Sequence, residues 1–269
     1  MSFANSSSLS VTTKQNYIFK GWCTINNSSD PTTCTGTNAE IIQPGNFLSL
    51  NTSSASITKA LYAVWRDNVK KIYMQDATLA DCGQTMYDKR DEKDYTTALI
   101  NGQCWMTQNL RFTGTSLSTT TSNVSADKTI SYGDLTSGNS YTEARIHNSG
   151  DTTTGVWYNF CAAGANESNA CNNSGSYSSS YDICPKNWHL PTNSQFTGIT
   201  SYIGAFSIVT GGIYDGGSLS NFDNGYWWSA TAYNAGSQLH LYYLSNGSHV
   251  GTYYLSKFIG SYVRCVRSS

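Results

Sequence analysis

Residues 184–192 read Cys-Pro-Lys-Asn-Trp-His-Leu-Pro-Thr, and this stretch constrains the fold more than any other part of the chain. Its two prolines favour a rigid turn, because proline locks one backbone dihedral. Apolar residues then recur at helical spacing, at Phe196, Ile199 and Ile203. The pattern predicts a helix over residues 193–203, capped by Thr192 or Asn193.

The final strand-like segment, residues 261–267, contains Val-Arg-Cys-Val-Arg and places Cys265 close to the end of the chain. A disulfide between Cys184 and Cys265 would close a loop of roughly 80 residues and, by the chain-entropy estimate, contribute roughly 4 to 5 kcal/mol. Such a bond would tie the end of the domain to its middle and form a stiff frame.

The chain contains eight cysteines but no Cys-x-x-Cys pair and no Cys/His spacing of a zinc site. We expect all of them to form disulfides: Cys23, Cys34, Cys82, Cys104, Cys161, Cys171, Cys184 and Cys265. Cys23 with Cys34, and Cys161 with Cys171, flank short polar loops that a local bridge would close. Because cytosolic thiols are kept reduced, this usage predicts an extracellular or cell-surface protein. No metal and no cofactor is expected.

The composition argues against several classes of partner. Charged residues make up 12% of the 269 residues, and the formal net charge is -1. Nucleic acids and anionic membranes are attracted by a basic patch or stripe, so neither is expected to bind. No apolar run approaches the roughly 20 residues that cross a bilayer, so no membrane insertion is expected.

Residues 1–66 contain short apolar runs separated by turn formers, which predicts strands. The order Tyr-x-Phe-x-Gly-Trp from Tyr17, a Pro44-Gly45 turn and Leu-Tyr-Ala-x-Trp from Leu61 resembles the Listeria-Bacteroides repeat of bacterial surface proteins. The resemblance implies a small β-grasp-like module that would act as a spacer or stalk. Its usual first strand has no counterpart here.

Three blocks of residues 67–269 stand in order: Asn-Gly-x-Cys-Trp-Met-x-x-Asn-Leu from Asn101, the stretch 184–192, and Tyr-Trp-x-Ser-Ala-Thr from Tyr226 with the terminal Arg-Cys strand. Together they resemble the Fibrobacter succinogenes major paralogous domain, of the C-type-lectin-like and formylglycine-generating-enzyme-like superfamily. The resemblance implies an α+β, C-type-lectin-like domain with long loops and few helices. Asn101-Gly102 itself predicts a hairpin, and the Ser/Thr-rich residues 113–155 predict loops.

Nothing in the sequence predicts catalysis. The Glu-Pro-Asn, Gln-Pro-Asp and Trp-Asn-Asp signatures of calcium-dependent lectins do not occur, and no Gly-x-Ser-x-Gly accompanies the four scattered histidines. Oxidase relatives need a reactive thiol, whereas Cys265 is better explained as the partner of Cys184. The charged run of residues 88–94 is interpreted as a solvated turn before a hairpin.

The stretch between Tyr226 and Arg264 has the Tyr, Ser, Asn and Gly composition of antibody binding loops. We therefore predict ligand-binding residues there and just upstream, at Asn221, Asp223, Tyr233, Asn234, His240, Tyr242, Ser248, His249 and Tyr253. The alternative is that a chain rich in Tyr and Ser looks like this everywhere, as residues 177–181 illustrate.

A lectin-like domain that ends in such a stretch before a fixed Arg-Cys strand resembles the variable proteins of diversity-generating retroelements. In that family, randomised adenines change Asn codons but never yield Trp, Gln or Lys. The resemblance implies fixed scaffold positions at Trp227, Trp228, Gln238 and Lys257. It implies a receptor or adhesin for a protein or glycan on another cell or virus. The rivals are a self-associating structural surface component and, third, an oxidase-like enzyme.

Overall fold

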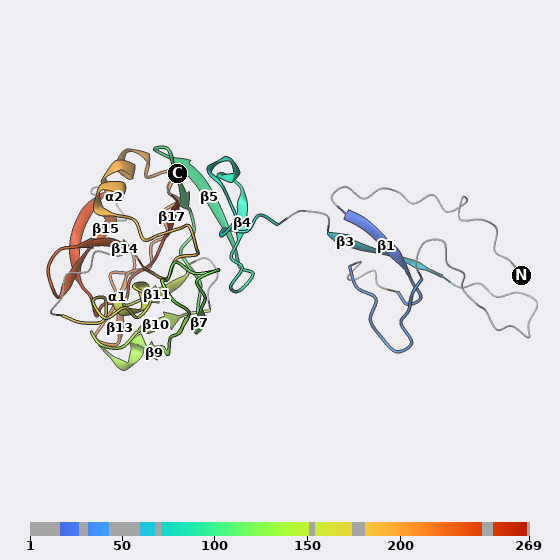
Figure 1. Ribbon diagram of the computed structural model, residues 1–269, viewed down its shortest axis with the longest axis horizontal. Coiled ribbons are helices and arrows are strands. Elements are labelled where there is room, and N and C mark those ends of the chain that lie inside the picture. Colours follow the sequence, from blue (N-terminus) through green and yellow to red (C-terminus); the bar gives the residue numbers. More distant parts are fainter. Residues whose placement is uncertain are drawn as a thin grey trace, which may run out of the picture. The chain divides into compact units, whose positions relative to one another are not determined.

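The computed structural model describes residues 17–26, 32–42, 60–67, 71–150, 154–173, 181–243 and 250–267. The chain divides into two compact units, Met1–Lys70 and Lys71–Ser269, which we call the N-terminal and the C-terminal unit (Figure 1). The described part of the chain has no helix that is long and apolar enough to cross a membrane.

The N-terminal unit contains an antiparallel sheet of order β2-β1-β3, with β1 at Tyr17–Cys23, β2 at Ile41–Ile42 and β3 at Tyr62–Asp67. Phe19 contacts the edges of Trp22 and Trp65, at ring centroid distances of 5.0 and 5.5 Å. Gly21 has φ +148°, and a Cβ there would lie 2.6 Å from the carbonyl oxygen of Ile42. Glycine at position 21 is thus required by the close approach of β1 and β2. The predicted Pro44-Gly45 turn lies outside the described residues.

The C-terminal unit begins and ends in one four-stranded antiparallel sheet. Its order is β17-β6-β5-β4, formed by Val266–Arg267, Gln103–Met106, Asp94–Ile100 and Thr85–Tyr87. Asn101 and Gly102 join β5 to β6 with φ values of 49° and 74°, as a tight hairpin requires. β17 pairs with β6, opposing Val266 to Trp105. The end of the chain therefore returns to the strands where the unit starts.

A second antiparallel sheet consists of β14, β15 and β16 at Gly225–Ala232, Ser237–Tyr243 and Val250–Ser256. Helix α2, Asn193–Ile199, lies beside this sheet and continues into a 3-10 turn, η4, at Thr200–Tyr202. The Thr192 side chain accepts the Gln195 amide, and the Gln195 side chain accepts the Thr192 amide. This capping box starts the helix where the sequence predicts it.

Short elements complete the unit. One sheet has the order β11-β10-β9, with β11 at Val156–Tyr158, β10 at Arg145–Asn148 and β9 at Gly133–Asp134. Two pairs of strands form separate two-stranded sheets: β12 (Ile213–Asp215) with β13 (Ser218–Ser220), and β7 (Ser116–Leu117) with β8 (Lys128–Thr129). The short helices are η2 (Leu79–Asp81), η3 (Leu135–Ser137) and α1 (Phe160–Ala163). Residues 113–155, predicted as loops, thus contain four of these strands. The described fold is rich in β-strand and poor in helix, as predicted.

The three sequence blocks meet in the core. Asn109, from the first block, accepts hydrogen bonds at Oδ1 from Trp227 Nε1 (2.7 Å) and Arg264 Nε (2.9 Å). In the 184–192 turn, Trp188 Nε1 donates to the carbonyl of Met74 (2.8 Å). All of these indole and guanidinium groups are buried. The first and third blocks are therefore connected through buried polar atoms. Two backbone hydrogen bonds between His189 and Val266, each 2.9 Å long, connect the 184–192 turn to the third block.

All eight cysteines form disulfides: Cys23–Cys34, Cys82–Cys104, Cys161–Cys171 and Cys184–Cys265. The pairs proposed from the sequence are present, and Cys82–Cys104 ties the segment before β4 to β6. Four disulfides fit an oxidising compartment outside the cytoplasm.

The interpretation of residues 88–94 as a fully solvated turn is wrong for two of them. Asp88 and Arg90 form a buried ion pair with an N–O distance of 2.6 Å. Gln75 donates to the same carboxylate (2.8 Å), and the guanidinium lies 4.0 Å from the Phe112 ring centre. The sequence shows the charges but not the partners that make their burial tolerable.

Candidate binding pocket

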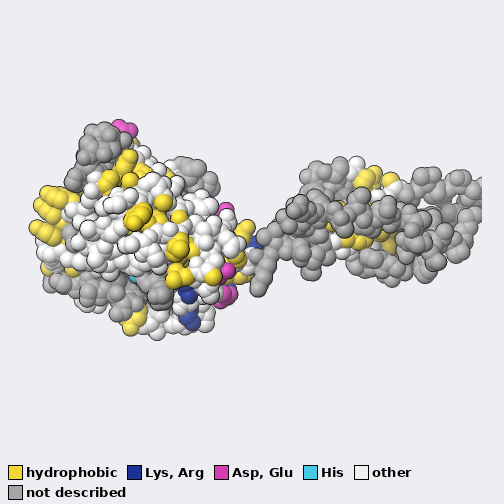
Figure 2. Space-filling view, turned by 90° about the horizontal axis from the view of Figure 1, so that it is seen from above, with side chains coloured by type: hydrophobic (Ala, Val, Ile, Leu, Met, Phe, Trp, Pro, Cys, Tyr) yellow, Lys and Arg dark blue, Asp and Glu magenta, His cyan; other side chains and the backbone are white. Residues whose placement is uncertain are grey.

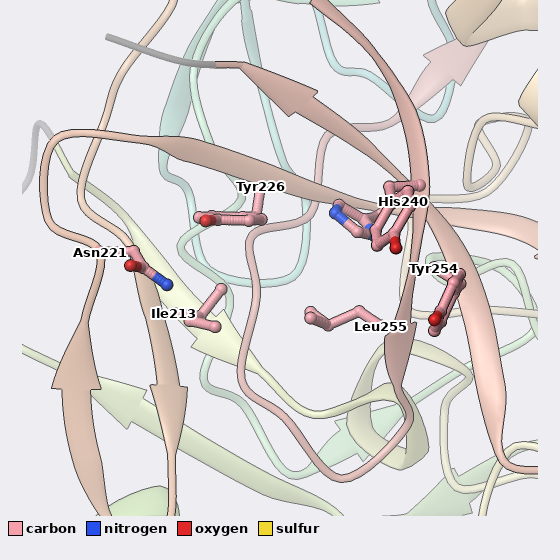
Figure 3. Close-up of a pocket in the computed structure, with 7 residues that line it drawn as sticks. Ile213, Asn221, Tyr226, His240, Tyr254 and Leu255 are labelled. Carbon is pink, nitrogen blue, oxygen red and sulfur yellow. The ribbon is translucent and has the colours of Figure 1, made fainter.

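A pocket with a volume of about 460 Å³ opens beside the β14-β15-β16 sheet. Its walls come from β12, the turn after β13 and all three strands of the sheet, and are formed by Ile213, Asn221, Tyr226, His240, Tyr253, Tyr254 and Leu255. Figure 3 shows the labelled side chains converging on one space, with Asn221 and Ile213 on one side and Tyr254 on the other. Three of the predicted ligand-binding residues, Asn221, His240 and Tyr253, therefore share one cavity.

Asn221 is held at the pocket wall by its backbone conformation. Its φ is 55°, a left-handed value that Asn tolerates better than other residues with a Cβ. Its carbonyl accepts the amide of Asn224 (3.0 Å), and the carbonyl of Asn224 accepts the amides of Gly211 and Gly212. The turn that carries Asn221 is thus fixed at both ends.

His240 lies at the inner wall, and its side chain is only 1% exposed. Its ring is 5.6 Å from that of Tyr226 and 6.5 Å from that of Tyr253, the latter nearly perpendicular. Burial lowers the pKa of His240 to about 4, so the imidazole is neutral at neutral pH. The sequence suggested a surface contact, but the structure makes His240 part of the cavity wall.

Exposed tyrosines continue from the pocket along the sheet. Tyr233, Tyr253 and Tyr254 are 54%, 59% and 41% exposed. The rings of Tyr233 and Tyr254 stack at 4.4 Å, and those of Tyr253 and Tyr254 at 4.5 Å. We call these three side chains the tyrosine stack. Such exposed aromatic surface is unusual unless it is covered by a partner.

The other predicted contacts lie near this surface or cannot be placed. Asn234 is exposed in the β14–β15 turn, where its Oδ1 accepts the amide of Gly236 (3.0 Å). Asp223 is exposed in the turn after Asn221. The side chain of Tyr242, and all of Ser248 and His249, lie outside the described residues. The backbone of Tyr242 pairs with Tyr226 and Gly251.

Four wall residues escaped the sequence analysis: Ile213, Tyr226, Tyr254 and Leu255. In the sequence, Tyr226 stands out only as the first residue of the Tyr-Trp-x-Ser-Ala-Thr block. Tyr254 lies in the same Tyr-rich and Ser-rich stretch as Tyr253. The two aliphatic residues carry no signal, because apolar side chains in strands usually belong to the core.

The four positions that the resemblance to variable proteins predicts to be fixed are all buried, in this sheet or at its end. Trp228 Nε1 donates to the carbonyl of Tyr158 (2.7 Å), and Gln238 Nε2 donates to that of Ser229 (3.1 Å). Lys257 Nζ donates to the carbonyl of Asn169 (3.0 Å). Trp227 donates to Asn109, as described above. Each of them is buried and donates a hydrogen bond to another segment of the C-terminal unit.

Among the residues that the structure describes, no charged side chain lines the pocket, and no group of three or more His, Cys, Asp or Glu side chains is placed to hold a metal ion. On the face of the C-terminal unit seen in Figure 2, acidic and basic side chains are few among uncharged ones. The described pocket lining therefore offers aromatic and amide contacts rather than ionic ones.

Comparison with known proteins gives one match. The family model of the Fibrobacter succinogenes major domain matches residues 99–208. The matched range runs from the β5–β6 hairpin through the 184–192 turn and helix α2, and ends before the first pocket residue, Ile213. No curated protein and no solved structure matches the chain. The matched range thus contains the first two of the three sequence blocks, whereas the third block and the pocket lie outside it.

Proposed function

We propose that the chain is an extracellular, non-enzymatic binding protein of the receptor or adhesin type, which recognises its partner through the pocket and the tyrosine stack. One observation carries this proposal. On the β14-β15-β16 sheet and the turns beside it, the residues expected to be fixed are buried and hydrogen-bonded, while Tyr233, Asn234 and Tyr253, expected to contact a ligand, are exposed. His240, also expected to contact a ligand, is buried in the pocket wall. This division allows surface side chains to change without a change of fold.

The proposal extends to the fold and family. A β-rich unit with long loops, few short helices and a disulfide from the last segment to the middle is compatible with a C-type-lectin-like domain. The burial of Trp227, Trp228, Gln238 and Lys257 supports a variable protein of a diversity-generating retroelement. The N-terminal unit would be a Listeria-Bacteroides-type stalk.

An oxidase-like activity is the less favoured reading. It needs a free, activated thiol at Cys265, and that sulfur is bonded to Cys184. A self-associating surface component is the remaining rival, since the tyrosine stack could also cover a second copy. Light scattering across protein concentration distinguishes the two: a binding protein keeps one mass, whereas a self-associating component gains mass.

The DNA beside the coding region tests the retroelement origin. We expect a near-identical template repeat that differs from the coding sequence only where the template has adenine. The affected codons should include those of Tyr233, Asn234 and Tyr253, and the codons of Trp227, Trp228, Gln238 and Lys257 should be unchanged. Differences scattered over all four bases would refute that origin.

Selection of peptides tests the binding surface. Phage-displayed random peptides are selected on the full chain and measured against a Tyr233→Ala/Asn234→Ala variant, whose residues lie beside the pocket but do not line it. The matched control is Ser201→Ala/Tyr202→Ala, an exposed pair in η4. We expect at least about tenfold weaker binding for the first variant only, since aromatic contacts dominate interface energies. Equal binding to all three chains would refute the proposed surface.

A further inference from the structure

The chemistry of the pocket narrows the kind of group that can enter it, and this step rests on the proposed function. None of the described residues that line it carries a charge, and the buried imidazole of His240 is neutral. A carboxylate, phosphate or ammonium group would be desolvated there without an ionic partner, which is costly. The occupant is therefore expected to be uncharged.

The walls are mainly carbon. Ile213 and Leu255 present alkyl groups, and the tyrosines present ring faces and edges. A sugar ring buried here would need partners for most of its hydroxyl groups, because an unpaired buried hydroxyl is destabilising. The polar side chains of the lining are Asn221, His240 and the hydroxyl-bearing rings of Tyr226, Tyr253 and Tyr254. Because these polar atoms sit on walls that are mainly aromatic and alkyl carbon, the lining suits an apolar group with one polar end better than a glycan.

Aromatic geometry and size favour a ring. The His240 and Tyr253 rings are already perpendicular, and Tyr253 continues into the stack through Tyr254. Aromatic rings prefer such edge-to-face and offset-stacked partners. A volume of about 460 Å³ lies within the range of small-molecule sites. Tyrosine and tryptophan are also the side chains that most often anchor protein interfaces in pockets.

We infer that this pocket is an anchor site for an uncharged aromatic side chain, Tyr, Trp or Phe, presented by a protein partner. The ring enters between Ile213, Tyr226 and Leu255, and Asn221 hydrogen-bonds its polar end where it has one. The tyrosine stack covers the backbone and neighbours of the anchor. Specificity then comes from the pocket, and much of the contact area comes from the exposed rings.

Small probes test the site on the full chain. Titration with p-cresol, followed by amide and side-chain NMR shifts, should give saturable shifts at Asn221 and His240 and intermolecular NOEs to the methyl groups of Ile213 and Leu255. Methyl glucoside and tetramethylammonium chloride, at the same concentrations, should give neither. Saturable binding of either of these two probes in place of p-cresol, or p-cresol NOEs elsewhere, overturns the inference.

A filled pocket provides the second arm. Ile213→Trp should weaken the affinity for p-cresol at least tenfold, because the indole fills the pocket. Tyr202→Trp places an indole on exposed η4 and should leave that affinity unchanged. The NOE pattern in the unsubstituted chain decides the question if the filled variant does not fold. The selected peptides separate this inference from the proposed function. Peptides that need Tyr233 and Asn234 but resist both Ile213→Trp and p-cresol would refute the anchor and leave the binding surface standing.

Discussion

Asp182 shows how one buried carboxyl group holds the turn that decides the fold. It accepts the backbone amides of Cys184 (2.9 Å) and Leu190 (2.8 Å), so it spans the start and the centre of the 184–192 turn. Burial raises the pKa of Asp182 to about 6, although these two amide hydrogen bonds act in the opposite direction. The folded chain therefore favours the protonated, uncharged form of the Asp182 carboxyl group.

This shift predicts a pH-dependent cost for Asp182→Asn. The folded-state pKa lies above the unfolded value of about 3.9, so the folded chain binds the proton more tightly. The stability that Asp182 contributes is therefore complete below about pH 4 and is lost as the pH rises through about 6. Asn does not titrate. Urea unfolding should show that the substitution costs up to about 3 kcal/mol less at pH 7 than at pH 4, at about 1.4 kcal/mol per pKa unit.

The exposed Asp223→Asn substitution serves as the control, because Asp223 lies on the surface and not in the turn. A cost of Asp182→Asn that is the same at both pH values would show that the carboxyl group titrates alike in the folded and unfolded chains.

The turn of the β5–β6 hairpin requires a left-handed backbone conformation at Gly102. Gly102 has φ +74°, and a Cβ at this position would meet nothing within 4 Å. The only penalty of a side chain is therefore conformational. Gly102→Ala should lower the free energy of unfolding by about 1 kcal/mol, the usual cost of left-handed backbone for alanine.

Gly204 provides the comparison, because a Cβ there also meets nothing within 4 Å and its φ lies outside the left-handed range. Gly204→Ala should be neutral or slightly stabilising, since it reduces the freedom of the unfolded chain. The two variants are compared by urea unfolding, and equal effects would contradict the conformational explanation.

Elements with a local signal were predictable from the sequence. Asn101-Gly102 predicts its hairpin, and Thr192 with Gln195 marks the start of α2. The strands within residues 113–155 could not be predicted. Most of them have two residues, which is too few to show the alternation of apolar and polar side chains that marks a strand. Likewise, the exposure of Tyr233 follows from its position in a turn, whereas the burial of His240 depends on strands that pair with β15 from both sides.

At the scale of the whole molecule, the Cys184–Cys265 disulfide joins residues that are 81 positions apart, while Cys161–Cys171 joins residues only 10 apart. Removing the long bridge by Cys184→Ala/Cys265→Ala should cost about 2 kcal/mol more than Cys161→Ala/Cys171→Ala, since the loop-closure entropy grows with the logarithm of loop length. Urea unfolding of both variants measures the difference. Equal losses would mean that local packing around the sulfurs, rather than the long closure, sets their contribution.

The ladder that joins β15 and β16 consists of main-chain amides and carbonyls, and it runs without interruption from Ser237 opposite Ser256 to Tyr243 opposite Val250. Exchanging an outward-facing side chain leaves each rung of that ladder in place. In the proposed binding protein, outward-facing side chains of these strands contact the partner, while the main chain and the buried side chains hold the fold. We therefore expect chains that differ only at exposed positions of this sheet to melt at nearly the same temperature.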